Sequence, residues 1–367
     1  MNITMFYHSL ISDWNHGNAH FLRGVVTELL GRGHEVRVFE EKNNWSLTNL
    51  LSSGGKTAVE DFNIKFPSLS SNFYDPETIN LDSILAGQDL VIVHEWNEHG
   101  LVKKIGDHKA KNGKYILLFH DTHHRSVTDP QGIQKYDLSA YDGVLAYGAL
   151  IKEIYLQKGY TENAWTWHEA ADVKIFYPHQ NTNFSGDLVW IGNWGDEERT
   201  KELFEFLIEP VKELGLKAKV YGVRYPETAL QALQQAGIEY GGWLPNYKVP
   251  EIFSRYKVTV HVPRKPYVEA LPGIPTIRPF EALACGIPLI SAPWNDIEGL
   301  FTAGKDYLVA NDKEEMKRHL NSILNNKTLA HDLSDHGLET IKRRHSCVHR
   351  VDELLRIVEQ VKMEVMG

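Results

Sequence analysis

The segment from Gly273 to Trp294 combines an arginine, a glutamate and several prolines around a predicted helix start. We expect Pro279 in the first turn of a helix that Gly286 ends, followed by a strand. A helix N-terminus presents unpaired N–H groups to a phosphate, and Arg278, just before that end, adds bidentate contacts. Glu281, in the first turn, is placed to accept bonds from two ribose hydroxyls. Helix capping by Glu281 and a solvated Arg278 are the alternative, and spacing alone does not decide between them.

Cations also follow two predicted strands of the same half. The loop after Trp190 carries Asn193 and then Arg199 and Lys201, and the strand ending near Val262 is followed by Arg264 and Lys265. A diphosphate in a water-poor site needs at least one such cation. These four cations are therefore candidate diphosphate ligands. A solvated, charged turn is the alternative at each place.

The first half places Asp13-Trp-Asn-His-Gly-Asn18 between a strand and a helix. Gly17 lets the backbone approach a ligand closely. His16 is a candidate general base because an unperturbed imidazole pKa of about 6.5 suits proton removal near neutrality. A plain loop histidine is the alternative. The loop lacks the full glycine fingerprint of dinucleotide binding, which makes a dehydrogenase unlikely.

His120 and Asp121 end a predicted buried strand. A carboxylate beside an imidazole fixes its tautomer, although adjacent residues of one strand often point apart. His120, His123 and His124 also suggest a metal cluster, which the lack of a nearby cysteine or further acidic cluster disfavours. The chain has no Asp-X-Asp triplet, which weakens any function in which a bound divalent metal ion holds a diphosphate substrate. We expect no cofactor and no metal.

Strands and helices alternate throughout the chain, and this pattern predicts parallel sheets covered on both faces. Predicted strands lie at 2–7, 36–38, 89–94, 114–120, 142–147, 187–192, 217–222, 256–262 and 287–292. Predicted helices lie at 18–30, 197–214, 228–237, 279–285, 313–325 and 348–363. We expect two Rossmann-like α/β domains at 1–178 and 179–347, joined through the polar stretch 177–183, and a C-terminal helix at 348–367.

Composition narrows the class of protein further. The 367 residues carry a formal net charge of -9, so a general nucleic-acid binder is not expected. No apolar run reaches the roughly 20 residues of a membrane span. The two cysteines stand in no paired motif, which fits a cytoplasmic protein. A local basic stretch is either a solvated helix face or a peripheral contact with the inner membrane face; it comprises Lys103, Lys104, Lys109, Lys111 and Lys114.

The Gly273–Trp294 segment resembles the donor-binding signature of glycosyltransferases with the two-Rossmann (GT-B) architecture, in the family 1/4-like group and closest to its CgeB-like branch. Residues 299–301, 304–308 and 345–350 continue the resemblance, which covers most of 187–355. It implies two domains facing across a cleft, with the C-terminal helix returning to the N-terminal domain.

The resemblance also implies roles for single residues. Glu281 would bind the donor ribose, the loop through Thr276 and Ile277 would approach the diphosphate, and the basic residues after Asn193 would meet it. The loop through His16 and Gly17 would face the acceptor and the donor sugar. His120 and Asp121 would lie near that sugar.

One position departs from the family pattern. Many retaining members carry a glutamate eight residues before the ribose-binding one, where this chain has Gly273. Retention of anomeric configuration therefore does not carry over. We expect a metal-independent hexosyltransferase that uses a nucleotide sugar, with UDP favoured, and a glycan, lipid-linked or small-molecule acceptor. A nucleotide-sugar epimerase and a non-catalytic protein that keeps the fold are the rivals.

Overall fold

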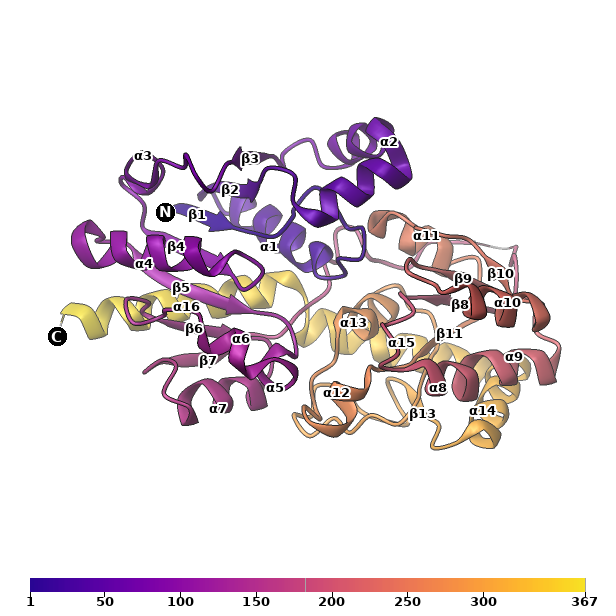
Figure 1. The fold of residues 1–367 in the computed structure, drawn as a ribbon. Coiled ribbons are helices and arrows are strands. Elements are labelled where there is room, and N and C mark those ends of the chain that lie inside the picture. Colours follow the sequence, from indigo (N-terminus) through magenta and orange to yellow (C-terminus); the bar gives the residue numbers. More distant parts are fainter. Residues whose placement is uncertain (182, 367) are drawn as a thin grey trace. The chain divides into compact units, whose positions relative to one another are not determined.

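The computed structural model describes residues 1–181 and 183–366, which form two compact units (Figure 1). Unit 1 comprises Met1–His168 together with the chain from Cys347 onward, and unit 2 comprises Glu169–Ser346. The predicted junction at 177–183 includes Thr182, which lies outside the described residues. Each unit is an α/β domain with its own parallel sheet.

The sheet of unit 1 has seven parallel strands in the order β3-β2-β1-β4-β5-β6-β7. The strands are β1 (Asn2–Phe6), β2 (Glu35–Glu41), β3 (Ser71–Tyr74), β4 (Leu90–His94), β5 (Ile116–Asp121), β6 (Gly143–Ala146) and β7 (Ala164–Thr166). The central strands β4 and β5 are apolar and fully buried, as a sheet covered on both faces requires.

Eight helices are described in unit 1: α1 (Ala19–Gly31), α2 (Trp45–Lys65), α3 (Leu81–Leu85), α4 (His99–Asn112), α5 (Arg125–Thr128), α6 (Pro130–Gln134), α7 (Ala149–Gln157) and α16 (Cys347–Met366). Figure 1 shows α16 in yellow beside the strands of unit 1, where Arg32, the residue after α1, pairs with Asp352 at 2.6 Å. The predicted return of the C-terminal helix to the N-terminal domain is confirmed.

The sheet of unit 2 has six parallel strands in the order β10-β9-β8-β11-β12-β13. They are β8 (Leu188–Ile191), β9 (Ala218–Tyr221), β10 (Glu239–Tyr240), β11 (Val258–His261), β12 (Leu289–Ser291) and β13 (Leu308–Val309). The helices are α8 (Thr200–Leu203), the π-helix η1 (Phe204–Ile208), α9 (Glu209–Leu214), α10 (Glu227–Gln235), the 3-10 turn η2 (Asn246–Lys248), α11 (Val249–Phe253), α12 (Lys265–Glu269), α13 (Ile277–Ala284), α14 (Lys313–Asn325) and α15 (Lys327–Arg344).

Residues 169–178 pack into unit 2, although the sequence predicts them in the first domain. Phe176 is buried in the same apolar cluster as Val189 and Phe280, and the Ala171 N–H donates to the His345 carbonyl at 2.9 Å. An apolar side chain joins the core that it can reach, whereas the proline and polar residues that suggested a boundary at 178 mark only a surface turn.

Both sheets reverse their strand order at one place, and this fixes where loops gather. In unit 1 the chain runs outward from β1 to β3 and returns to β4 on the other side of β1. In unit 2 it runs outward from β8 and returns to β11 on the other side of β8. Ligands of doubly wound sheets bind at such switch points, outside the carboxyl ends of the strands.

In the described part of the chain, no helix combines the length and the apolar character needed to cross a membrane.

Candidate functional site

The start of α13 places the Arg278 and Glu281 pair, and it differs from the prediction. The helix begins at Ile277, two residues earlier than expected, so Arg278 lies inside the first turn and Glu281 in the second. Pro279 is tolerated there because the first four N–H groups of a helix have no intrahelical partner. The N-cap residue Thr276 makes no side-chain hydrogen bond to the helix, so its hydroxyl does not cap those N–H groups.

Glu281 is fully buried and both of its carboxylate oxygens have partners. Asn246, in η2, donates to Oε1 at 2.6 Å, and Arg278 forms an ion pair with Oε2. The two contacts fix the orientation of the carboxylate in the second turn of α13. Sequence reasoning missed Asn246; its place beside Glu281 depends on a contact 35 residues away along the chain.

Arg199 lies at the N-cap of α8, in the loop that follows β8 at the switch point. Its guanidinium donates to carbonyl oxygens of Val262 at 2.7 Å, Asn193 at 2.5 Å and Trp194 at 3.4 Å, and it stacks on Trp190. The side chain therefore ties the loop after β8 to the end of β11. These hydrogen bonds hold the loop in place, and the predicted contact of Arg199 with a diphosphate stays a prediction.

Three predicted cations gather at this edge. Burial lowers the pKa of Arg199, and the positive charges of Arg264 and Arg278 lower it further. The same cations, Arg199 and Arg278, add to the effect of burial on His261, whose pKa falls to about 3. A neutral imidazole beside a cluster of guanidinium groups indicates a positive potential, which suits an anionic ligand.

The loop after β8 is conformationally strained. Gly195, Asp196 and Glu197 have φ of 95°, 52° and 71°, so two non-glycine residues in succession lie in the left-handed region. Arg224, also at positive φ, forms an ion pair with Asp196 at 2.8 Å. Strain of this kind costs about 1–3 kcal/mol per residue and is concentrated at ligand-binding sites.

The other predicted diphosphate ligands differ in exposure. Arg264 is partly exposed and binds Glu198 at 3.2 Å. Lys265, at the first position of α12, is exposed and lies 3.6 Å from Glu269. Lys201 is exposed on α8. Arg199, which is partly buried, and Lys201, which is exposed, therefore have different surroundings.

Gly273 shows why a glutamate is absent at this position. Its φ of 90° lies in the left-handed region. A Cβ there would meet Cγ1 of Ile297 at 2.6 Å and Cγ of Glu298 at 3.2 Å. The space that a side chain at 273 would enter is thus already filled, in part by another carboxylate-bearing side chain.

In unit 1, two buried charges fix the loop after β1. The Glu40 carboxylate, at the end of β2, accepts from the N–H groups of Leu10 at 2.7 Å and Ile11 at 3.2 Å and from the Ser9 hydroxyl at 2.8 Å. From α1, Arg23 donates to the carbonyls of the same Leu10 and Ile11, at 2.7 and 2.6 Å. Donors and acceptors of this short segment are therefore held by opposite charges.

This loop determines the tautomer of His16. Its Nε2 lies 3.1 Å from the Ser9 carbonyl oxygen, which can only accept. Nε2 therefore carries the proton, and Nδ1 keeps the lone pair that a general base needs. Burial, followed by the charges of His8 and Arg23, lowers the pKa of His16 well below its usual value. The ring is neutral at physiological pH. Gly17, half-buried, follows it.

His120 and Asp121 point to opposite faces of the sheet. The His120 ring packs on Trp167, with ring centres 4.8 Å apart, whereas the Asp121 carboxylate accepts from Tyr155 at 2.8 Å and from the His123 N–H at 3.0 Å. Within 1–181 and 183–366, no hydrogen bond joins His120 to Asp121, and neither His120 ring nitrogen has a partner. The carboxylate therefore does not fix the tautomer of this imidazole.

A chain of buried imidazoles connects the two predicted catalytic histidines. His94, on β4, is the register partner of His120, and their ring centres lie 5.4 Å apart. The His94 ring is 6.5 Å from that of His16. Burial lowers the pKa of His94 well below its usual value and that of His120 to about 3. The carboxyl edge of the unit 1 sheet is therefore lined by polar imidazole rings that carry no charge.

Trp96 was missed by the sequence reasoning. It follows β4 at the switch point and is 43% exposed, in contrast to fully buried Glu95 before it. The Arg125 guanidinium lies 4.6 Å from the centre of its indole and pairs with the Glu95 carboxylate. The available signal was an aromatic residue just after a predicted strand end.

The remaining predictions concern metals and membranes. His123 and His124 stack at 4.0 Å, on the loop after β5; among the described residues, no group of three or more His, Cys, Asp or Glu side chains has the arrangement of a metal site. In the basic stretch, Lys103 pairs with Asp107 and Asp137, and Lys109 with Asp142.

Comparison with solved structures identifies the architecture. Sucrose-phosphate synthase from Thermosynechococcus elongatus matches with a TM-score of 0.66 at 13% identity, over 99% of this chain and 100% of that one. An α-glucosyltransferase in complex with UDP and a 13-mer DNA matches with a TM-score of 0.72 at 12% identity, over 98% and 100%. The chain has the GT-B fold. The T4 phage β-glucosyltransferase in complex with UDP-glucose also matches, with a TM-score of 0.61 at 12% identity over 98% and 99%.

Sequence comparison adds one finding. Residues 199–356 match the family described as "Glycosyl transferase-like", which covers most of unit 2 and the start of α16. No curated protein sequence matches. The predicted CgeB-like branch stays a prediction.

Proposed function

We propose that this protein is a glycosyltransferase that moves a hexosyl group from a nucleoside-diphosphate sugar to an acceptor hydroxyl, without a metal ion. The observation that carries the proposal is the gathering of Arg199, Arg264 and Arg278 near the uncapped start of α13, with Glu281 one turn further on. The match of this region to a glycosyl transferase-like family supports it.

The diphosphate and the ribose of the nucleotide-sugar donor each have proposed binding residues in unit 2. Arg278, Arg264 and the N–H groups of Thr276–Ile277 and α13 take the diphosphate, with Lys265 and Lys201 as exposed partners. Arg199 keeps Asn193 and its loop in place. Glu281, positioned by Asn246, accepts from the ribose. Uridine is the favoured base, since the structural neighbours include complexes with UDP and UDP-glucose.

The chemistry is a single displacement. A bond forms between the acceptor oxygen and the anomeric carbon, the bond from that carbon to the diphosphate oxygen breaks, and its electron pair stays on the diphosphate. Guanidinium groups and helix N–H donors stabilise that developing charge, usually the largest catalytic term. If the reaction inverts, Nδ1 of His16 receives the acceptor proton; if it retains, with attack from the side of the leaving group, the departing diphosphate oxygen receives that proton. His120 and Asp121, on the same sheet edge, help to position the sugar.

Trp96 suggests that the acceptor side takes a saccharide, because a rigid indole stacks on a sugar ring. One structural neighbour binds DNA, but the net charge of -9 disfavours a polyanionic partner here. DNA therefore belongs in the acceptor panel as an arm that we expect to be negative.

The first test is thermal unfolding with UDP, GDP, dTDP, ADP and CDP, on the wild type and on Glu281→Ala. A ligand at 100 times its dissociation constant adds about 2.7 kcal/mol of stability. We expect UDP to stabilise the wild type and not the variant, with EDTA leaving the effect unchanged. If no nucleotide stabilises the wild type, the donor site is wrong. Donor turnover without any acceptor would instead indicate an epimerase.

A further inference from the structure

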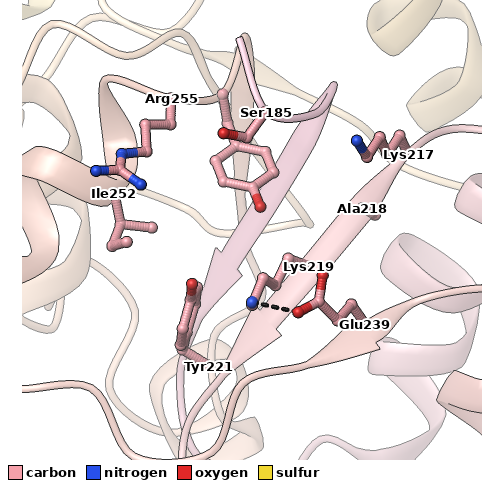
Figure 2. A pocket seen from close by; sticks show the side chains of 9 residues that line it. Ser185, Lys217, Ala218, Lys219, Tyr221, Glu239, Ile252 and Arg255 are labelled. Carbon is pink, nitrogen blue, oxygen red and sulfur yellow. Dashed lines mark hydrogen bonds and ion pairs between the residues drawn. The ribbon is translucent and has the colours of Figure 1, made fainter.

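Unit 2 contains a hollow that none of the predicted donor-binding residues lines. It has a volume of about 200 Å³ and runs along one side of β9 (Figure 2). Ser185 and Lys217 enter it from the segments before β8 and β9, and Arg255 and Tyr256 from the segment before β11. Those walls come from the amino ends of the strands, whereas the candidate donor site lies at the carboxyl ends.

The hollow is rich in hydrogen-bond donors and positive charge. Lys217, Lys219 and Arg255 line it against one carboxylate, that of Glu239, in a protein whose net charge is -9. The hydroxyls of Ser185, Tyr221 and Tyr256 add further donors. A site with many donors and few acceptors selects an anion with several oxygens.

Existing ion pairs leave these cations available to a ligand. Figure 2 shows Lys219 paired with Glu239, whose side chain is 66% exposed. Arg255 pairs with Glu251, and both of those side chains are about half exposed. Exposed pairs contribute only about 0–1 kcal/mol, so an incoming anion can replace either carboxylate at little cost.

Backbone hydrogen bonds and two glycines shape the walls of the hollow. The Ser185 N–H donates to the Arg255 carbonyl at 2.7 Å, and the Asp187 N–H to the Lys217 carbonyl at 2.8 Å, which joins the three segments. Two glycines admit the aromatic walls. A Cβ at Gly186 would lie 2.7 Å from Cε1 of Tyr256, and one at Gly241 would lie 2.6 Å from Cδ1 of Tyr221.

We propose that this hollow binds a phosphomonoester, a small organic molecule with one terminal phosphate, separately from the donor. Lys217, Lys219 and Arg255 hold the phosphate, and Tyr221, Tyr256 and Ile252 contact the organic body. The volume is below the roughly 300–1,000 Å³ of drug-sized sites, which limits the ligand to the size of a sugar phosphate or nucleoside monophosphate. The site is independent of the proposed transferase activity.

The test measures binding by calorimetry with glucose 6-phosphate, uridine 5′-monophosphate, inorganic phosphate and glucose. Lys217→Glu reverses one wall charge, and Lys212→Glu, at an exposed position on α9 outside the hollow, is the matched control. We expect at least one ester to bind the wild type and the control alike, with affinity about tenfold or more lower in Lys217→Glu, equivalent to about 1.4 kcal/mol. Inorganic phosphate should bind more weakly than that ester, and glucose should not bind.

Glu281→Ala separates this site from the donor site. Ester binding that survives Glu281→Ala but is lost in Lys217→Glu supports the proposal, whether or not a nucleoside diphosphate binds elsewhere. Tighter binding of glucose 6-phosphate would indicate that the ligand is a sugar phosphate, and tighter binding of uridine 5′-monophosphate would indicate a nucleoside monophosphate. The proposal is overturned if neither ester binds, if inorganic phosphate binds as tightly as the esters, or if Glu281→Ala abolishes binding while Lys217→Glu leaves it unchanged. Because Lys217 is exposed, both charge variants should fold, which circular dichroism checks.

Discussion

The carboxyl edges of the two sheets have opposite electrostatic character. In unit 1, His16, His94 and His120 are buried and neutral, and Glu40 and Arg23 hold the loop of His16 largely through its backbone groups, with Arg23 also paired to Asp13. In unit 2, the Arg278 guanidinium pairs with buried Glu281, and Arg199 and Arg264 add guanidinium groups to the same sheet edge. The first edge is suited to proton transfer and hydrogen bonding, and the second to binding an anion.

The difference shows how one fold supports two roles. Both edges lie at a switch point of strand order, so the backbone presents loops in the same way. Side-chain chemistry then decides what each edge binds. A neutral edge costs little to bury, whereas a positive edge is stable only with partial exposure, carboxylate partners or a bound anion.

The largest effect is expected for His16→Ala. Loss of the proposed general base should lower kcat by about 10²–10⁴-fold, while UDP should stabilise the variant as it does the wild type, because the proposed nucleotide-binding residues lie in unit 2. Steady-state kinetics with the identified donor and acceptor measures this. If kcat stays within a factor of a few of the wild type, the neutral edge is not the proton acceptor and the comparison between the edges fails.

Glu40→Ala tests whether a buried charge fixes the loop of His16. The change leaves the N–H groups of Leu10 and Ile11 and two hydroxyls without their acceptor and should lower the free energy of unfolding by about 3–5 kcal/mol. Glu60→Ala, at an exposed position on α2, should cost less than about 0.5 kcal/mol. Urea unfolding gives both values. Equal costs would show that the carboxylate of Glu40 is dispensable.

Arg278→Ala and Arg199→Ala should separate ligand binding from structure in unit 2. Arg278 is partly exposed and pairs with buried Glu281, so its loss should weaken UDP binding by about 2 kcal/mol, roughly thirtyfold, and should also lower stability because the buried carboxylate loses its ion-pair partner. Arg199 holds three carbonyls, so its loss should chiefly lower the melting temperature. Calorimetry and thermal unfolding distinguish the two; the reverse pattern would exchange their roles.

The neutral edge should make the protein acid-sensitive. His94 and His120 have folded-state pKa values below the unfolded value of about 6.5. Below pH 6.5 the unfolded chain binds more protons, so stability, complete above that pH, should fall by up to about 1.4 kcal/mol per pH unit for each histidine, down toward pH 3 for His120. His261 acts likewise, and Glu95, whose pKa burial raises, opposes the trend.

The free energy of unfolding in urea at pH 7.0 and 5.5, for the wild type and His120→Phe, measures this slope. The variant removes one titrating ring from an apolar neighbourhood, so its free energy of unfolding should decrease less between pH 7.0 and pH 5.5 than that of the wild type. An identical slope in both proteins would mean that His120 is already charged in the folded state.

Trp96→Ala should give the smallest effect, about 1 kcal/mol on acceptor binding, seen as a several-fold rise in the acceptor KM with kcat and UDP affinity unchanged. Trp45→Ala, which removes another half-exposed indole of unit 1, is the control. A wild-type KM in Trp96→Ala would remove the saccharide-stacking surface from the neutral edge.

Much of the architecture could be predicted from the sequence. Short continuous apolar runs located β4 and β5, which are buried on both faces, and the helical period of apolar residues located α1 and α16, which are buried on one side. It did not show α2 or α15. The polar α15 sequence has few apolar residues to mark a face, and α2 contains Gly55 at φ 64°, where two helices meet at a kink.

Of the candidate site, the sequence determined which residue types stand at which strand ends, and therefore that Glu281, Arg278 and His16 were worth naming. Only the tertiary structure decided that Arg199 donates to backbone carbonyls, that Asp121 turns away from His120, that Asn246 contacts Glu281 in unit 2, and that Trp96 is half-exposed beside Arg125 in unit 1. Strand ends follow from local periodicity, which a chain records in order. Burial, tautomers and ion pairs depend on contacts between segments far apart in sequence, and those exist only once the sheets have formed.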